Sequence, residues 1–171
     1  MAPLVILVVV TLVALLARRL GITMLPGPAV PLRIGLAAMF TATGLAHFIG
    51  MRAELIRMVP PGLPAPGFLV TLTGVLELAA VFGLLIPRTA RWTAIGLTVQ
   101  LVAMFPANVH AALAHQSSAP EDQLLPRTLM QLVFLAATVA VAAHRTAASG
   151  LPPHPRFSGP HRPPELGREK R

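Results

Sequence analysis

One carboxyl group stands inside a long apolar stretch of the chain and is the first candidate for chemistry. Residues 65–87 contain a single charged residue, Glu77. If this stretch is a helix that crosses a membrane, Glu77 lies roughly 15 Å from the outer end of that helix. An ionised carboxylate is too costly to face lipid there, so Glu77 must be protonated or have a partner inside the protein. Two interpretations stay open: a proton-handling or ligand-binding carboxyl, and a structural hydrogen bond that fixes helix packing.

His47 is the titratable side chain that we expect to pair with Glu77. It falls near the outer end of the preceding expected helix, with Thr43 and Gly44 on its face one turn earlier. The expected boundaries leave the two side chains about 9 Å apart along the bundle axis, a gap that a tilt or shift of one helix would close. Such a pair would handle protons, and the alternative is again a structural role.

Two later segments carry polar residues at helical spacing. Gln100, Met104 and Asn108 recur at every fourth position and therefore share one helix face. Arg127 and Gln131 share a face of the last apolar segment in the same way. We therefore expect both segments to turn polar groups toward neighbouring helices, because such groups are costly against lipid.

These residues predict one pocket in the outer half of a helical bundle. Its expected ligand-binding or proton-handling residues come from four helices: His47, Glu77, Asn108, Arg127 and Gln131. Glu77 would lie beneath the other four, and Gln100 and His110 are secondary candidates, with His110 on another side of its helix. The alternative is a set of separate hydrogen bonds between helices.

Several other kinds of site are not expected. His47, Glu77 and His110 would supply two histidines and a carboxylate, but no residues have the local spacing of a metal motif, so we expect no metal. The sequence also has no Walker loop, dinucleotide fingerprint or nucleophile elbow. With no cysteine, this chain forms no disulfide, thiol redox centre or thiolate metal site.

The composition is that of a protein embedded in a bilayer, which is its first expected partner. Hydrophobic residues make up 54% of the 171 residues and charged residues only 12%, against about 25% charged in soluble domains. Runs of about 20 apolar residues are long enough to cross a hydrocarbon core of about 30 Å. The net charge of +8 would suggest nucleic acid in a soluble protein. Here the basic residues lie between apolar segments and in the tail, without interleaved aromatics, so we expect no nucleic-acid partner.

The expected fold class is all-α: a transmembrane four-helix bundle core with an additional N-terminal transmembrane helix. Five helices are expected, at residues 2–17, 32–51, 67–86, 92–115 and 127–144, the first being the shortest. Residues 53–59 suit one or two amphipathic turns, and the proline-rich stretch that follows is expected to be extended. The chain then divides into an N-terminal helix and loop (1–31), a four-helix membrane domain (32–145) and a disordered basic tail (146–171).

The basic residues predict the direction of the helices. With five spans, one side of the membrane receives eleven Arg and Lys residues and the other side receives three. Because basic residues stay in the cytoplasm, the C-terminus is expected there and the N-terminus outside. If the first segment does not span, the other four helices keep this orientation.

The polar residues lie in sequence motifs that resemble those of the DoxX family of small bacterial membrane proteins. The motifs follow one another in the order and spacing of that family over residues 32–145: Gly44-Leu45-Ala46-His47-Phe48, Met58-Val59-Pro60-Pro61-Gly62-Leu63-Pro64, Leu72-Thr73-Gly74-Val75-Leu76-Glu77-Leu78, Gly83-Leu84-Leu85-Ile86-Pro87, Phe105-Pro106-Ala107-Asn108-Val109 and Arg127-x-x-x-Gln131. The resemblance implies a four-helix core in a bacterial cytoplasmic membrane. Members of the wider group are linked to quinone-coupled sulfur oxidation, to oxidoreductase assemblies, and to assembly of other membrane proteins.

Three functions remain open at this point. The first is an accessory or scaffold subunit of a membrane-associated complex, such as an oxidoreductase, with no independent catalytic activity. The second is a binding protein or enzyme for a quinone or another small apolar molecule in the outer-half pocket around His47 and Glu77. The third is a small transporter, which ranks last because the sequence shows no internal repeat and no pair of broken helices.

Overall fold

The computed structural model describes residues 1–22, 27–114 and 123–144, and the regular elements in these ranges are all helices. They are α1 (Ala2–Arg19), α2 (Val30–Ala46), α3 (Arg52–Met58), α4 (Pro66–Leu85), α5 (Ala90–Leu113) and α6 (Leu124–Ala143). The expected all-α class is confirmed. The expected tail at residues 146–171 lies outside the described residues.

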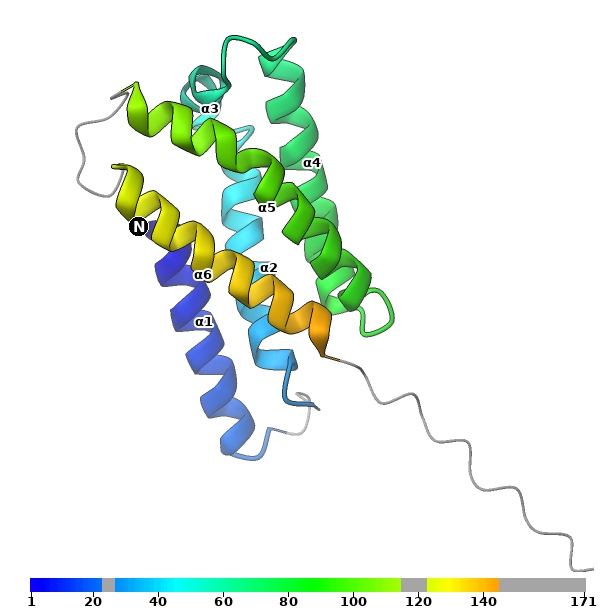
Figure 1. Ribbon diagram of the computed structural model, residues 1–171. Coiled ribbons are helices and arrows are strands. Elements are labelled where there is room, and N and C mark those ends of the chain that lie inside the picture. Colours follow the sequence, from blue (N-terminus) through cyan, green and yellow to red (C-terminus); the bar gives the residue numbers. More distant parts are fainter. Residues whose placement is uncertain (23–26, 115–122, 145–171) are drawn as a thin grey trace, which may run out of the picture.

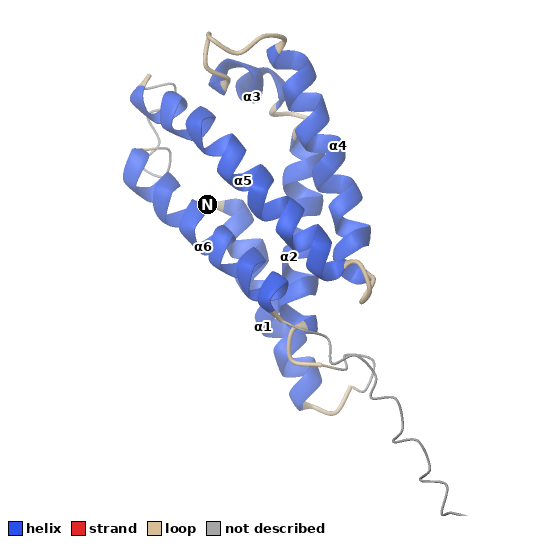
Figure 2. Ribbon diagram, turned by 45° about the vertical axis from the view of Figure 1, so that its right-hand side comes forward, coloured by secondary structure: helices blue, strands red, loops and turns tan. Residues whose placement is uncertain are grey.

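Five long helices run alternately up and down, and the short α3 lies across one end of them (Figures 1 and 2). α2 packs against α1 on one side and α4 on the other, while α5 packs against α4 and α6. We call the end that carries α3 the α3 end. The opposite end carries five of the described arginines and is called the basic end: Arg18, Arg19, Arg33, Arg88 and Arg91.

Four of the helices, α1, α4, α5 and α6, are long and apolar enough to cross a membrane. Large apolar side chains on them are turned outward, among them Phe82, which is 69% exposed, and Val99, which is 63% exposed. Outward apolar side chains along whole helices suit contact with lipid chains. The chain is therefore a membrane protein.

The helix boundaries differ from the expected ones in α2. We expected this helix to continue to residue 51, but it ends at Ala46 and gives way to a turn that closes at Gly50, where φ is +79°. With 17 residues against 18 in α1, α2 is the shortest of the five long helices, so the expectation that the first helix is the shortest was wrong. His47 is the C-cap residue of α2, with φ −66° and ψ −20°, so it still follows the path of the helix.

The segment between α3 and α4 is also less extended than expected. Leu63 N–H donates to the carbonyl of Pro60 over 3.0 Å, which closes a turn. Ala65, directly before the first proline of α4, has φ +50° and ψ +57°. This left-handed conformation is uncommon for a residue with a Cβ atom, and it turns the chain where an extended residue was expected.

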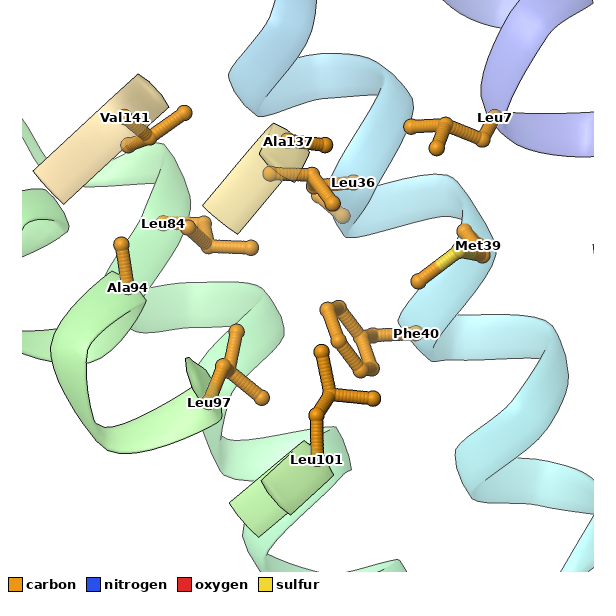
Figure 3. Close-up of a cluster of buried hydrophobic side chains, with 11 residues drawn as sticks. Leu7, Leu36, Met39, Phe40, Leu84, Ala94, Leu97, Leu101, Ala137 and Val141 are labelled. Carbon is orange, nitrogen blue, oxygen red and sulfur yellow. The ribbon is translucent and has the colours of Figure 1, made fainter. Parts of the chain in front are cut away.

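The apolar core lies toward the basic end, and Figure 3 shows its side chains. Leu36 and Phe40 of α2 meet Leu84 of α4, Leu97 of α5 and Val141 of α6, and all five are at most 3% exposed. This cluster fixes four helices in one half of the bundle. The half nearer to α3 is packed differently, with polar side chains and a cavity.

Candidate functional site

Three polar side chains lie together between α2 and α4. The Thr43 hydroxyl donates a hydrogen bond of 2.6 Å to Oε2 of Glu77. Nδ1 of His47 lies 4.0 Å from the same carboxylate oxygen. His47 and Glu77 are 3% and 4% exposed, so the group is enclosed by protein. The structure thus brings together the two residues that the expected boundaries left apart, at a close approach of α2 and α4.

The hydrogen bonds of His47 indicate where its ring protons lie. Nδ1 lies 2.8 Å from the carbonyl oxygen of Thr43. A carbonyl oxygen only accepts, so Nδ1 carries a proton and donates. In the neutral ring Nε2 therefore has a free lone pair, and it makes no hydrogen bond with the described part of the chain. Nε2 is therefore the ring nitrogen that can accept a hydrogen bond.

Glycine permits the close approach of the two helices at this point. A Cβ atom added at Gly74 of α4 would lie 2.5 Å from Cβ of His47 and 2.8 Å from the ring of Phe48. Real side chains do not pack that closely, so any larger residue would push α2 and α4 apart. Gly74 is thus a requirement for the short distance between His47 and Glu77.

Arg52 fixes the turn that carries His47. Its guanidinium donates to the His47 carbonyl over 3.3 Å and to the Thr71 hydroxyl over 3.0 Å. These bonds join the start of α3 to the first turns of α4 and hold the turn between them. The position of the His47 ring therefore depends on two helices besides its own.

A cavity of about 240 Å³ opens beside His47 toward the α3 end. Its wall is mainly apolar, with polar contributions from His47, Thr73, Gln100 and Asn108. The apolar lining comes from α3 and the segment after it, from α4, and from one face of α5: Leu55, Met58, Val59, Leu63, Leu69, Val70, Ala103, Met104 and Ala107. Thus three of the predicted site residues, His47, Gln100 and Asn108, line one cavity.

The other predicted residues lie behind the cavity or away from it. Glu77 is not part of the wall and lies behind His47. Arg127 donates to Oδ1 of the lining residue Asn108 over 3.4 Å. Gln131 turns to α5, where its amide donates to the Leu101 carbonyl over 2.7 Å, and His110 donates from Nδ1 to the Met58 carbonyl over 3.2 Å. The structure therefore places Gln131 and His110 in bonds between helices rather than at the cavity.

No group of three metal-ligating side chains occurs within residues 1–22, 27–114 and 123–144. The histidines also come from different places in the fold, with His47 beside Glu77 and His110 bonded to the end of α3. What the arrangement provides is a hydrogen-bonding histidine, backed by a carboxyl group, on the wall of an apolar cavity.

Sequence reasoning missed two features of this region. The apolar side chains of α3, Leu55 and Met58, form part of the cavity wall; the amphipathic spacing of residues 53–59 was the available signal. Arg33, for which no contact was expected, lies on α2 and is buried, with 7% exposed. Its Nε and Nη2 donate to the carbonyls of Leu84 and Leu85 over 2.6 and 2.8 Å, which caps the end of α4.

Comparison with known proteins gives one relationship. No curated protein and no solved structure matches the chain. A family model matches residues 36–147, a range that includes most of α2 and all of α3 to α6. The matched range contains the Thr43–His47–Glu77 group and the whole cavity wall. The chain therefore belongs to the family described as domain of unknown function DUF8561.

Proposed function

We propose that this membrane protein binds a small ring molecule, with quinones as the ligand class, in the cavity at the α3 end. The observation that carries the proposal is an apolar cavity of about 240 Å³ with His47 on its wall. Ligand sites typically combine apolar walls with a few polar groups that orient the ligand. This cavity has that combination.

The volume limits the size of the ligand. An apolar protein cavity of about 150 Å³ accepts benzene, so 240 Å³ suits one substituted ring. A long isoprenoid tail would have to leave the cavity. Leu63 and Ala103 line it and are themselves exposed, which provides a rim over which a tail could pass into lipid.

The polar groups suit the oxygens of such a ring. In the neutral tautomer, Nε2 of His47 accepts a hydrogen bond from a hydroxyl group, as in a reduced quinone. When the ring is protonated, Nε2 donates to a carbonyl oxygen, and the carboxylate of Glu77, 4.0 Å from Nδ1, stabilises the positive charge. On the α5 wall, Nε2 of Gln100 already donates to the Thr73 carbonyl over 3.1 Å, so its Oε1 and the amide of Asn108 are the further polar groups. The resemblance to the DoxX family, with its quinone-linked members, supports the choice of quinones.

Binding of decylubiquinone to the full-length protein in neutral detergent tests this proposal. We expect saturable binding by the wild type and about tenfold or greater loss of affinity in the His47→Ala, Glu77→Ala double variant, since each 1.4 kcal/mol corresponds to a factor of ten. Glu54→Ala is the control, because it removes a carboxyl group that does not line the cavity. Equal affinities of the wild type and the double variant for decylubiquinone would contradict the proposal.

A second function, that of an accessory subunit that holds a membrane partner, is favoured by a separate observation. Gln131, His110 and Arg52 all donate to backbone carbonyls of other helices or turns, which makes them contributors to a rigid bundle. Such a subunit needs no turnover of its own. It would co-purify with a membrane partner, such as an oxidoreductase, and would keep that partner in the Glu77→Gln variant.

For the orientation in the membrane, we propose that the basic end faces the cytoplasm of a bacterial cell. The described part of that end carries Arg18, Arg19, Arg33, Arg88 and Arg91, whereas the α3 end carries Arg52, Arg57 and Arg127. Because loops rich in basic residues are usually retained in the cytoplasm, this excess of arginine supports the orientation. The cavity would then open toward the outer half of the membrane.

A further inference from the structure

We propose a second binding site, at the basic end, for a phosphate group. The site is a small cavity of about 30 Å³ that Arg33, Arg91 and His144 line together with Ala29, Ala90 and Val141. It is separate from the quinone cavity, which lies toward the α3 end, so the proposal does not depend on the function proposed above. Three basic side chains from α2, α5 and the end of α6 meet here.

Arg33 is the central group of this site. It is 7% exposed, and its Nε and Nη2 donate to the carbonyls of Leu84 and Leu85. These partners are the last carbonyls of α4, which carry a partial negative charge, so they stabilise the guanidinium in part but supply no full counter-charge. The third nitrogen, Nη1, makes no hydrogen bond with the described part of the chain, and the side chain lines the cavity. A buried cation of this kind is stabilised by an anion.

The described chain supplies no carboxylate for this purpose. Its two acidic side chains are Glu54 of α3 and Glu77, which lies beside His47. Neither forms an ion pair with Arg33 or Arg91. An anion at this end would therefore have to come from outside the described part of the protein.

The surrounding helix ends also favour an anion. Ala29 is the N-cap of α2 and Ala90 is the first residue of α5, and both line the cavity. The N-terminus of a helix carries a partial positive charge and is a common position for phosphate groups. Here two such ends and two arginines surround the same space.

The size of the cavity suits the phosphate of an anionic phospholipid. A cavity of about 30 Å³ holds roughly two water-sized atoms, which matches two free oxygens of a phosphate whose ester bonds lie outside. The guanidinium of Arg91 lies 5.9 Å from the centre of the Trp92 ring, and Trp92 is 71% exposed. Tryptophan at a helix end marks the level of the lipid head groups, and basic pockets between membrane helices are known sites for them.

Native mass spectrometry of the full-length protein in neutral detergent tests the site. Phosphatidylglycerol is titrated against dioleoylglycerol, which has similar chains but no phosphate. We expect phosphatidylglycerol to be retained preferentially, and Arg91→Gln to weaken its binding about fivefold, the loss expected for one arginine near an anionic head group. Arg88→Gln is the matched control, because Arg88 is exposed at the same end and does not line the cavity. The experiment is done in detergent because an anionic bilayer surface would attract Arg88 and Arg91 equally and would hide the difference between the two variants.

One further variant and one competitor complete the test of the phosphate site. Arg33→Gln, checked for an unchanged melting temperature, should weaken binding of phosphatidylglycerol at least as much as Arg91→Gln. Inorganic phosphate at millimolar concentration is added as a competitor: displacement of the lipid would identify free phosphate as an alternative source of the same group. Equal binding of phosphatidylglycerol by the wild type, Arg91→Gln and Arg33→Gln would overturn the proposal, as would equal retention of dioleoylglycerol.

Discussion

Nδ1 of His47 and Oε2 of Glu77 lie 4.0 Å apart, and the hydroxyl of Thr43 donates to the same carboxylate oxygen over 2.6 Å. The three groups occupy the interface of α2 and α4, with His47 alone of the three on the wall of the cavity. The buried carboxyl group of Glu77 therefore lies beside His47 but is not itself part of the cavity wall. His47 is thus one of the polar side chains of the cavity wall and the one that lies beside a carboxyl group.

The approach of α2 and α4 should depend on the absence of a side chain at Gly74. We expect Gly74→Ala to destabilise the protein by about 1–3 kcal/mol, because the new Cβ overlaps His47 and Phe48. Thermal unfolding in detergent measures this. Gly96→Ala is the control, since a Cβ there meets no atom within 4 Å and alanine favours helix; its melting temperature should not fall. Equal melting temperatures of Gly74→Ala and Gly96→Ala would contradict the close packing.

The hydrogen bond from Thr43 should contribute to stability as well as to position. Thr43→Val keeps the shape and removes the donor to Glu77, at a cost of about 1–2 kcal/mol for a hydrogen bond between membrane helices. Unfolding in detergent gives the change. Thr41→Val serves as the control, because the Thr41 hydroxyl bonds only to the Ala37 carbonyl of its own helix. The idea fails if both variants lose the same amount.

The proposed orientation can be tested with single cysteines, since the chain has none of its own. Gly62→Cys lies at the α3 end and Arg88→Cys at the basic end, and both positions are exposed. A membrane-impermeant maleimide should label Gly62→Cys in spheroplasts and Arg88→Cys only after the membrane is opened. The reverse pattern would place the basic end outside and contradict the retention of basic loops in the cytoplasm.

Apolar runs and proline positions were enough to predict the number of long helices. α4 and α5 begin within two residues of the expected positions, at Pro66 and Ala90, because helix starts follow local chemistry. The end of α2 was placed five residues too late, at residue 51 instead of 46. The turn after α2 has Gly50 at φ +79° and contacts Arg52 and α4, and these contacts between elements are not visible in the sequence pattern.

The candidate site was only partly predictable for the same reason. Spacing along one helix placed Gln100 and Asn108 on a common face, and both line the cavity. Spacing cannot tell which neighbour a face meets, so Gln131 was expected at the pocket and instead bonds to the Leu101 carbonyl. The bonds of Arg33 could not be predicted either, because its carbonyl partners, at Leu84 and Leu85, lie far along the chain. Such contacts depend on how helices pair.

The central claim is that the cavity beside His47 is a ligand site, and filling it tests that claim most directly. Ala107→Leu adds a larger side chain to the wall of the cavity, whereas Val99→Leu changes a side chain that is 63% exposed on the same helix. Decylubiquinone is titrated into each full-length protein in neutral detergent, after a check that the melting temperatures match. We predict that Ala107→Leu lowers the affinity about tenfold or more and that Val99→Leu leaves it within about twofold of the wild type. The same affinity in all three proteins, or no binding by the wild type, would contradict the account.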